Sequence, residues 1–320
     1  MGVNGGLPGL EQVNRRSLKR GMKHDGITGY TLDIDATGIE AEKQTAKMTY
    51  KGFKGCMPIG GHLAENGLVV GDEFREGNVA PATRNLAFIK HCVRQMPKGK
   101  RITALRSDSA AYQAEIINYC EGNGIQFAIG ADLDPSVLTA IEAIPEDDWK
   151  PYQNGSIAET IHSMEKTEEA FRLIVIRRPY QSTLFAHEEA SLTYTVIATN
   201  KMDSAEDVVA WYNQRGECSE NRIKELKIGF GMERMPCGQL TANAMFFRIG
   251  TLAYNLFRLF TLKVLSPSWH RHQVETVRWR LYQIAGKIVF HGGQVFLKVR
   301  RGLCHLFADI RFRIWEFATT

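Results

Sequence analysis

Apolar and polar side chains alternate along the segment from Tyr30 to Asp35. An alternation with a period of two predicts a β-strand that buries one face. Asp33 and Asp35 both project from the other face, where two neighbouring carboxylates repel each other unless a cation or solvent lies between them. We therefore expect Asp35, or Asp33 one pleat deeper, to belong to a polar site at the end of this strand.

The pattern after this strand predicts a mixed α/β core. Two further strands complete an antiparallel meander, and a helix and a strand then alternate twice, which implies a parallel pair joined by a right-handed crossover. Three antiparallel strands followed by this alternation are the layout of a ribonuclease H-like fold. The expected segments are strands near 43–53 and 67–74, a helix at 82–96, a strand at 101–106, a helix after Asp108 and a strand at 125–129.

Changes of pattern divide the chain into five segments, and the third of them interrupts the core. It is acidic and contains prolines, and it carries two strand-like runs, so it reads as a β-rich insertion. The last segment contains a hairpin that turns at 291–293. The expected segments are a basic flexible arm at 1–27, the first part of the core at 28–130, the insertion at 131–200, the helical part of the core at 201–265 and a basic region at 266–320.

The charge distribution points to a polyanionic partner. The 320 residues carry a net charge of +5, but residues 270–320 hold nine Lys or Arg against three Asp or Glu, and residues 11–23 hold five against one. Basic ends around a mixed middle are typical of nucleic-acid binding. The most apolar segment, 244–265, is interrupted by Arg248, Arg258 and Lys263 and predicts a buried helix, not a membrane span. We expect a cytoplasmic protein without a membrane partner.

A second cluster of charge lies on a helix that begins near Ser219. Glu220, Lys224 and Lys227 fall at i, i+4 and i+7 and share one helix face. An acid beside two lysines suits a site that holds a metal ion and also grips a phosphate backbone. The alternative is a solvated helix stabilised by Glu–Lys pairs.

Three carboxylates can converge in this layout. The first and fourth strands of a ribonuclease H-like core end side by side, so Asp35 (or Asp33) would meet Asp108, and a later helix would bring Glu220 to the same edge. An oxygen-only site of this kind suits Mg²⁺, and two such ions can drive an in-line phosphoryl displacement. The alternatives are that Asp108 is a helix N-cap, that Asp35 is a solvated carboxylate, and that Glu217 takes the place of Glu220.

Four motifs in order carry a resemblance to a known family. They are Leu32–Thr37 (LDIDAT), Tyr50–Gly55 (YKGFKG), Arg106–Ser109 (RSDS) and Tyr212-x-x-Arg215 followed by Glu220-x₆-Lys227. In this order and at these separations the chain resembles bacterial insertion-sequence transposases of the DDE type that carry the YREK signature. The resemblance runs from about residue 27 to the C-terminus.

The resemblance implies a DNA transposase that cleaves strands at the element's ends and transfers the freed 3′-hydroxyl to target DNA. It implies that Asp35, Asp108 and Glu220 are the catalytic, metal-binding triad for two Mg²⁺ ions, with Mn²⁺ as a substitute. Its expected partners are double-stranded transposon ends and target DNA, bound by a homodimer associated with the bacterial nucleoid. The residues expected to hold DNA phosphates are Tyr212, Arg215, Lys224 and Lys227.

Two departures from the signature keep rival functions open. Four residues separate Arg215 from Glu220 where the signature has three, and one residue rotates a helical position by about 100°. If both residues face the site, Arg215 must therefore lie in the turn before the helix. Only 34 residues precede Asp35, fewer than in relatives. The rivals are a catalytically inactive, truncated remnant that binds DNA, and a ribonuclease H-like nuclease or resolvase.

Overall fold

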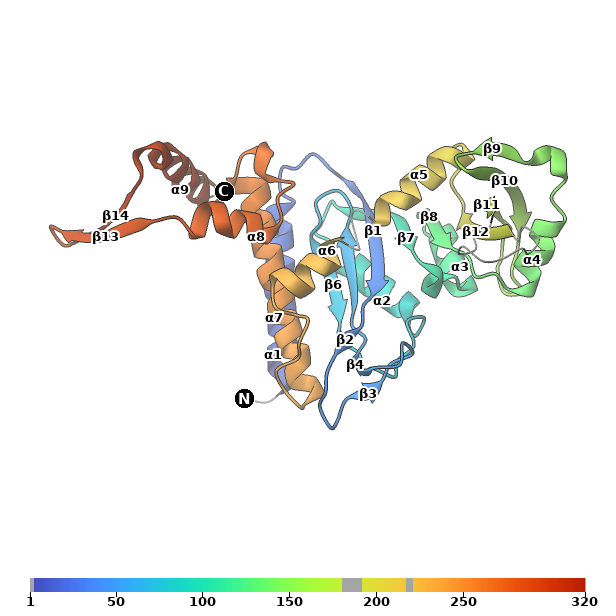
Figure 1. Ribbon diagram of the computed structural model, residues 1–320, viewed down its shortest axis with the longest axis horizontal. Coiled ribbons are helices and arrows are strands. Elements are labelled where there is room, and N and C mark those ends of the chain that lie inside the picture. The colour runs from blue at the N-terminus through green and yellow to red at the C-terminus, as the bar shows by residue number, and fades with distance from the viewer. Residues whose placement is uncertain (1–2, 180–191, 217–220, 320) are drawn as a thin grey trace, which may run out of the picture.

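A long mixed sheet forms the centre of the protein. The computed structural model describes residues 3–179, 192–216 and 221–319, and within them nine strands pair in the order β6-β5-β1-β7-β8-β12-β11-β10-β9 (Figure 1). The strands are β1 (Gly29–Ala36), β5 (Ile59–Leu63), β6 (Val69–Glu73), β7 (Arg101–Ser107), β8 (Gln126–Gly130), β9 (Lys150–Tyr152), β10 (Gly155–His162), β11 (Phe171–Pro179) and β12 (Leu192–Thr199).

The first five of these strands have the topology expected from the sequence. β5 is antiparallel to both β1 and β6, whereas β7 is parallel to β1 and to β8. The helices α2 (Asn85–Gln95) and α3 (Ala114–Gly122) supply the crossovers before β7 and β8. A large mixed sheet flanked by helices is confirmed, and it is consistent with a ribonuclease H-like fold.

The alternation along β1 sets the two faces of the sheet. Tyr30, Leu32 and Ile34 are buried in one apolar cluster with residues of α2 and α3. Apolar clusters that include Val69 and Ala128 cover the other face of the sheet. The helices α5 (Ala205–Arg215) and α7 (Leu240–Leu259) contribute to them, as does Leu226, just after the short helix α6 (Asn221–Lys224). Both faces of the sheet are therefore covered.

The expected strand near 43–53 is wrong. Residues 39–56 instead form a small separate sheet of β2 (Ile39–Glu40), β3 (Lys47–Met48) and β4 (Lys54–Cys56), and β5 takes the middle place in the meander. The sequence of β5, IGGHL, has two glycines and so a weak strand signal. Close packing requires one of them, because a Cβ at Gly61 would lie 2.8 Å from the Cys92 Sγ atom.

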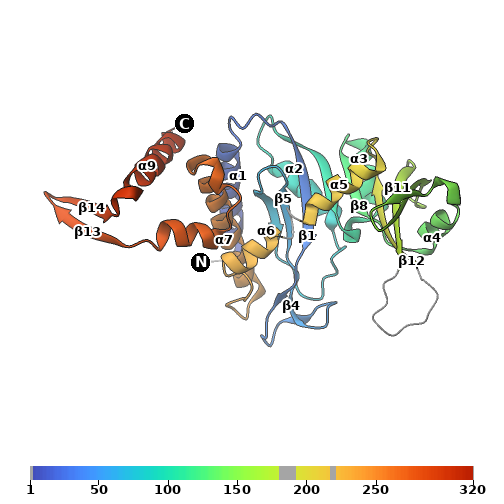
Figure 2. The ribbon, with the colours of Figure 1, turned by 45° about the horizontal axis from the view of Figure 1, so that its top comes forward.

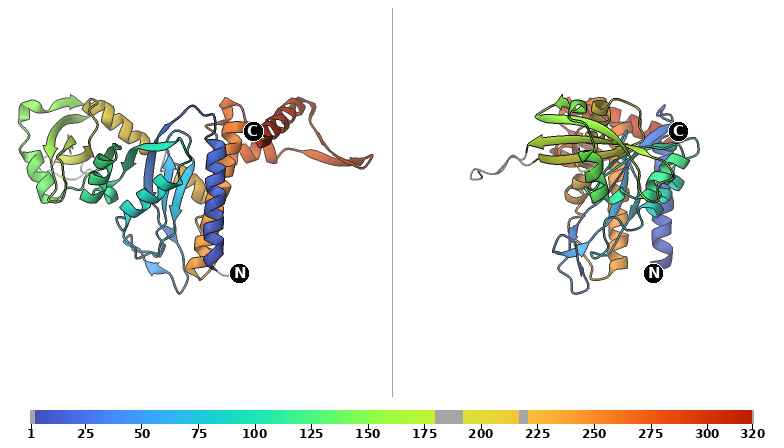
Figure 3. Two further views of the ribbon diagram at one scale, coloured as in Figure 1. Left: turned by 180° about the vertical axis from the view of Figure 1, so that it is seen from behind. Right: turned by 90° about the vertical axis from the view of Figure 1, so that its right-hand side faces the viewer.

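The N-terminal segment is not the loose arm expected for residues 1–27. Residues 3–21 form helix α1, which runs beside α7 (Figure 3). Glycine makes this close approach possible, since a Cβ at Gly21 would lie 2.1 Å from a methyl carbon of Leu259. Asn255 Nδ2 donates to Asn14 Oδ1 at 2.7 Å and to the Val69 carbonyl at 2.8 Å, so one buried amide joins α1, α7 and β6.

Residues 131–200 are β-rich, as expected, but they continue the central sheet. β12 pairs with β8 in antiparallel register, with Ala198 opposite Ile129, and β11, β10 and β9 follow outward. Helix α4 (Pro135–Glu142) packs on β10. The strands of the lobe at the right of Figure 1 therefore belong to the same sheet as the strands of the core.

The C-terminal region projects from the body as an arm. The hairpin of β13 (Gly286–His291) and β14 (Gln294–Val299) turns at Gly292–Gly293 as expected, and Figure 2 shows it extending away from α7. The helices α8 (Val274–Val277) and α9 (Cys304–Thr319) lie before and after it. Among the described residues, no helix is long and apolar enough to cross a membrane.

A buried histidine sits beneath the sheet face that α7 covers. The His62 ring lies edge-on to the Tyr254 ring, with centroids 6.3 Å apart. Neither ring nitrogen has a hydrogen-bond partner among the described residues. Burial, reinforced by the positive charge of Arg222, lowers the pKa of His62 to about 3.

Stability is expected to fall as the pH drops below 6.5, because the unfolded chain then binds a proton at His62 that the folded chain excludes. With a folded-state pKa of about 3, this site alone costs about 2 kcal/mol between pH 7.5 and pH 5. Urea unfolding at both pH values measures the loss. His62→Leu should lose less stability over this interval than the wild type, whereas His291→Gln in the exposed hairpin turn should behave as the wild type. An unchanged loss in His62→Leu would contradict the assignment.

Candidate active site

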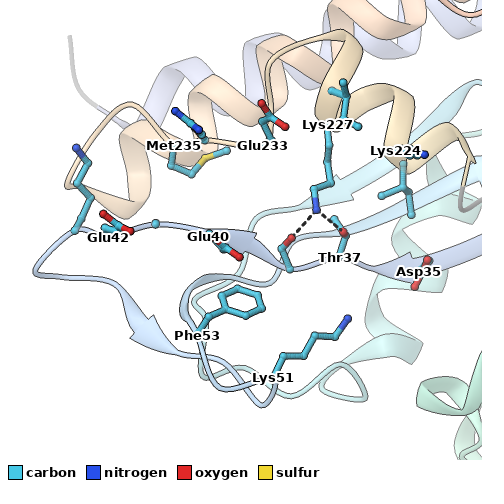
Figure 4. Close-up of a pocket in the computed structure, with 16 residues that line it drawn as sticks. Asp35, Thr37, Glu40, Glu42, Lys51, Phe53, Lys224, Lys227, Glu233 and Met235 are labelled. Atoms are coloured by element: carbon cyan, nitrogen blue, oxygen red, sulfur yellow. Dashed lines mark hydrogen bonds between the residues drawn. The ribbon is translucent and has the colours of Figure 1, made fainter.

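The first predicted carboxylate, Asp35, lines an open cavity of about 1080 Å³. Asp35 lies near the end of β1, and the strand alternation points it away from the apolar cluster around Leu32. The cavity wall on the far side is formed by α6 and the π-helical segment Glu225–Gly229, with the small β2–β4 sheet below (Figure 4). Asp35 is therefore exposed to a space large enough for a polymeric substrate.

The second predicted carboxylate, Asp108, follows the last residue of β7. Ile34 pairs with Ser107 in the parallel register of β1 and β7, so Asp35 and Asp108 each come one residue after a paired position. Neighbouring strands lie about 4.8 Å apart, and the main chains at the two residues are therefore adjacent. Asp108 also caps the short helical turn 109–111, because its Oδ1 atom accepts from the Ala110 N–H at 3.2 Å.

Asp33, the alternative to Asp35, is engaged in an ion pair. Its side chain is fully buried, and its Oδ1 and Oδ2 atoms accept from Arg106 Nε at 2.7 Å and Nη2 at 2.8 Å. Burial raises the pKa of Asp33, while the charges of Arg106 and Arg215 oppose that rise. Both carboxylate oxygens of Asp33 are thus occupied by one guanidinium.

Arg106 is a structural element of the site that the sequence reasoning missed. Its Nη1 atom also donates to the Trp211 carbonyl at 2.6 Å, and its guanidinium lies 5.1 Å from the Trp211 ring centroid. One buried side chain therefore ties β1, β7 and α5 together. The available signal was a cation directly before Ser107-Asp108, after the mostly apolar residues 102–105 of the same strand.

Tyr212 and Arg215, both predicted to bind DNA, lie on the last turns of α5. A Cβ at Gly130 would lie 2.9 Å from the Tyr212 hydroxyl oxygen and 3.6 Å from the Asp108 carbonyl carbon, so Tyr212 reaches the strand end that carries Asp108. The Arg215 guanidinium lies 5.6 Å from the Tyr212 ring centroid. The signature spacing placed Arg215 in the turn before the helix of Glu220. In the structure Arg215 is instead the last residue of α5.

Lys224 and Lys227, the other two predicted DNA contacts, line the same cavity as Asp35 (Figure 4). Lys227 Nζ donates to the Gly38 carbonyl at 2.8 Å and approaches the Thr37 hydroxyl at 3.5 Å. Burial lowers the pKa of Lys227, and the charge of Lys51 across the cavity adds to the effect. The Lys227 ammonium group is thus held beside the residues that follow the end of β1.

The third predicted carboxylate, Glu220, lies outside the described residues, as does its competitor Glu217. In residues 3–179, 192–216 and 221–319, no group of three His, Cys, Asp or Glu side chains could hold a metal ion. Asp35 and Asp108 are the two described carboxylates at the ends of β1 and β7. A third carboxylate would complete a site of three. Carboxylate oxygens are the donors that Mg²⁺ prefers.

Comparison with known proteins identifies the family. The model of the family described as Transposase DDE domain group 1 matches residues 17–310. No curated protein matches the chain.

Removing one partner of the buried Asp33–Arg106 pair should destabilise the protein strongly. Arg106→Met leaves the Asp33 carboxylate buried without its guanidinium, and we expect a loss of about 3–5 kcal/mol in the free energy of unfolding. Asp33→Leu combined with Arg106→Met removes both charges and should recover most of that loss. Urea unfolding followed by tryptophan fluorescence measures both variants.

A matched control is Arg177→Met, which removes a guanidinium paired with the largely exposed Glu146. It should lower the free energy of unfolding much less than Arg106→Met does, because solvent screens an exposed ion pair. A double variant as unstable as Arg106→Met alone would show that the ion pair is not the source of the loss.

Proposed function

The chain belongs to the Transposase DDE domain group 1 family, and on that premise we propose that it cleaves DNA at the ends of a mobile element and joins the freed 3′-hydroxyl to target DNA. The observation that carries the proposal is the parallel pairing of β1 and β7, in which Ile34 lies opposite Ser107. This register supports a joint role for Asp35 and Asp108, one residue further along each strand.

The proposed catalytic triad is Asp35, Asp108 and Glu220. Asp35 is preferred to Asp33 because the Asp33 carboxylate is held by Arg106 inside the protein, whereas Asp35 lines the cavity. The all-oxygen donor set fits Mg²⁺, with Mn²⁺ as a substitute. Two such ions, when bound, would activate the attacking oxygen and stabilise the leaving oxygen.

The chemistry consists of two phosphoryl displacements. In cleavage, a water oxygen bonds to phosphorus while the bond from phosphorus to the 3′ oxygen breaks, and that oxygen takes up a proton. In transfer, the freed 3′ oxygen bonds to a target phosphorus while the target's own bond from phosphorus to its 3′ oxygen breaks. The number of phosphodiester bonds is conserved in the second step, so no nucleotide cofactor is required.

The YREK signature would hold the DNA during both displacements. Arg215 and Lys227 are cations that can neutralise phosphates next to the cut. Tyr212 is supported as a third contact because its hydroxyl and the Asp108 main chain both lie close to Gly130. Lys224 on the cavity wall adds a further positive charge.

The same proposal covers the rest of the chain. Residues 131–200, between Asp108 and Glu220 in the sequence, would be the insertion of the family pattern. The basic C-terminal region would bind the duplex beyond the cut, and a homodimer would bring two ends together. The specific support for DNA binding without chemistry, the rival function, is the excess of cations in residues 270–320.

Metal-dependent nicking tests the proposal. A labelled duplex that carries the inverted repeats flanking the source gene is incubated with protein and Mg²⁺ or EDTA. Asp108→Asn keeps an oxygen that can cap the turn 109–111 but removes a carboxylate ligand. Loss of a side chain that only supports a metal ligand typically lowers activity by roughly 10- to 100-fold. Asp108 is proposed as a direct ligand, so the nicking rate should fall by at least this factor. Asp35→Asn should behave likewise.

Asp147→Asn, in an exposed turn of the β-rich lobe, is the matched control and should nick as the wild type does. Joined products with a second duplex would support strand transfer, and nicking without joining would favour a nuclease or resolvase. Salt-sensitive binding with no cleavage by the wild type would reduce the chain to a DNA-binding remnant.

A further inference from the structure

The cavity beside Asp35 has a second basic wall that the signature residues do not include. It is formed by the turn between β3 and β4, whose residue Lys51 lines the cavity opposite Lys227 (Figure 4). Lys51 is exposed, and the two lysines come from segments far apart in the sequence. Two ammonium groups thus face one space from opposite sides.

This turn is rigidly built. The Thr49 N–H donates to the Phe53 carbonyl at 2.8 Å, and Gly52 N donates to the Thr49 carbonyl at 3.1 Å with Gly52 at φ +84°. The Phe53 ring packs on the chain leaving β1, because a Cβ at Gly38 would lie 2.5 Å from the ring. The position of Lys51 relative to Asp35 is therefore fixed by packing.

Tyr50 holds the Lys51 side chain in place. The Lys51 Nζ atom lies 5.6 Å from the centroid of the Tyr50 ring, in a cation–π contact. The ring itself is 62% exposed and so contributes little to a core. Exposed aromatic rings beside cations are also found on the surfaces that bind single-stranded nucleic acids.

The charge on the two walls is unfavourable in the absence of an anion. Lys51 lowers the pKa of Lys227 across the cavity, in addition to the effect of burial. The carboxylates Glu40 and Glu42 line the end of the cavity away from Asp35 (Figure 4). Glu233 and Glu40 offset part of the repulsion at Lys227. A phosphate between Lys51 and Lys227 would relieve the rest.

We propose that Lys51 and Lys227 form a clamp for one phosphate of a DNA strand that passes through the cavity beside Asp35, with Tyr50 as a positioning residue for Lys51. This inference rests on the proposed function, because it takes DNA as the polyanion. It assigns the β3–β4 turn as a DNA-contacting element, in addition to the predicted contacts on α5, α6 and the segment after α6.

Binding of the full-length protein to a duplex in EDTA tests the clamp separately from cleavage. Lys51→Gln should reduce the slope of log K against log salt concentration by about 0.9, the value for one lost phosphate contact. Lys51→Arg should retain the slope. Lys54→Gln is the matched control, since it removes an exposed lysine of the same small sheet outside the cavity lining.

The positioning role of Tyr50 has its own test. Tyr50→Leu should weaken binding by roughly 2- to 5-fold, the range of an exposed cation–π contact, while leaving the salt slope nearly unchanged. Tyr50→Phe keeps the ring and should restore wild-type affinity. Equal effects of Leu and Phe would overturn the positioning role.

The outcomes separate the clamp from the proposed function. If the wild type nicks DNA but Lys51→Gln keeps the wild-type salt slope, the clamp is refuted and the function stands. If the slope falls in Lys51→Gln and not in Lys54→Gln, the clamp is supported whether or not the protein nicks. If the wild type does not bind DNA, both are overturned.

Discussion

The buried pair of Asp33 and Arg106 holds the central part of this protein together. It joins β1 to β7, the two parallel strands whose ends carry Asp35 and Asp108, and the same guanidinium reaches the main chain of α5 at Trp211. A bidentate pair has a defined geometry as well as a favourable energy. The ion pair therefore reinforces the register of the two strands, and with it the spacing of the candidate carboxylates, two residues before Asp35 and Asp108 are reached.

The two sides of the candidate site are supported in different ways. The strand side is rigid because it belongs to a sheet that is covered on both faces. The helical side is attached through Lys227, whose ammonium group contacts the main chain at Gly38. The strand ends thus provide a fixed reference, and cations from α5, α6 and the β3–β4 turn are arranged around it.

The sequence predicted the elements whose signal is local. Alternation along β1 and the crossovers to β7 and β8 were enough to place Asp35 and Asp108 at one edge. β5 was missed because its two glycines weaken the strand signal, although Gly61 is needed for packing against Cys92. The roles of Arg106 and α1 depend on partners about 70 and 240 residues away in the chain, and no local pattern reports such partners. The place of Glu220 stays a prediction.

The pairing of α1 with α7 has a consequence for how the protein is made. During synthesis α1 leaves the ribosome before α7, about 240 residues ahead of it. At about 5–20 residues per second, α7 follows only after roughly 12–48 s. A single glycine-containing helix gains little stability alone, so α1 must wait for α7 before Leu18 and Asn14 are buried. The wall that carries Lys227 is translated about 190 residues after Asp35, so the cavity beside Asp35 is completed only after that later segment has emerged.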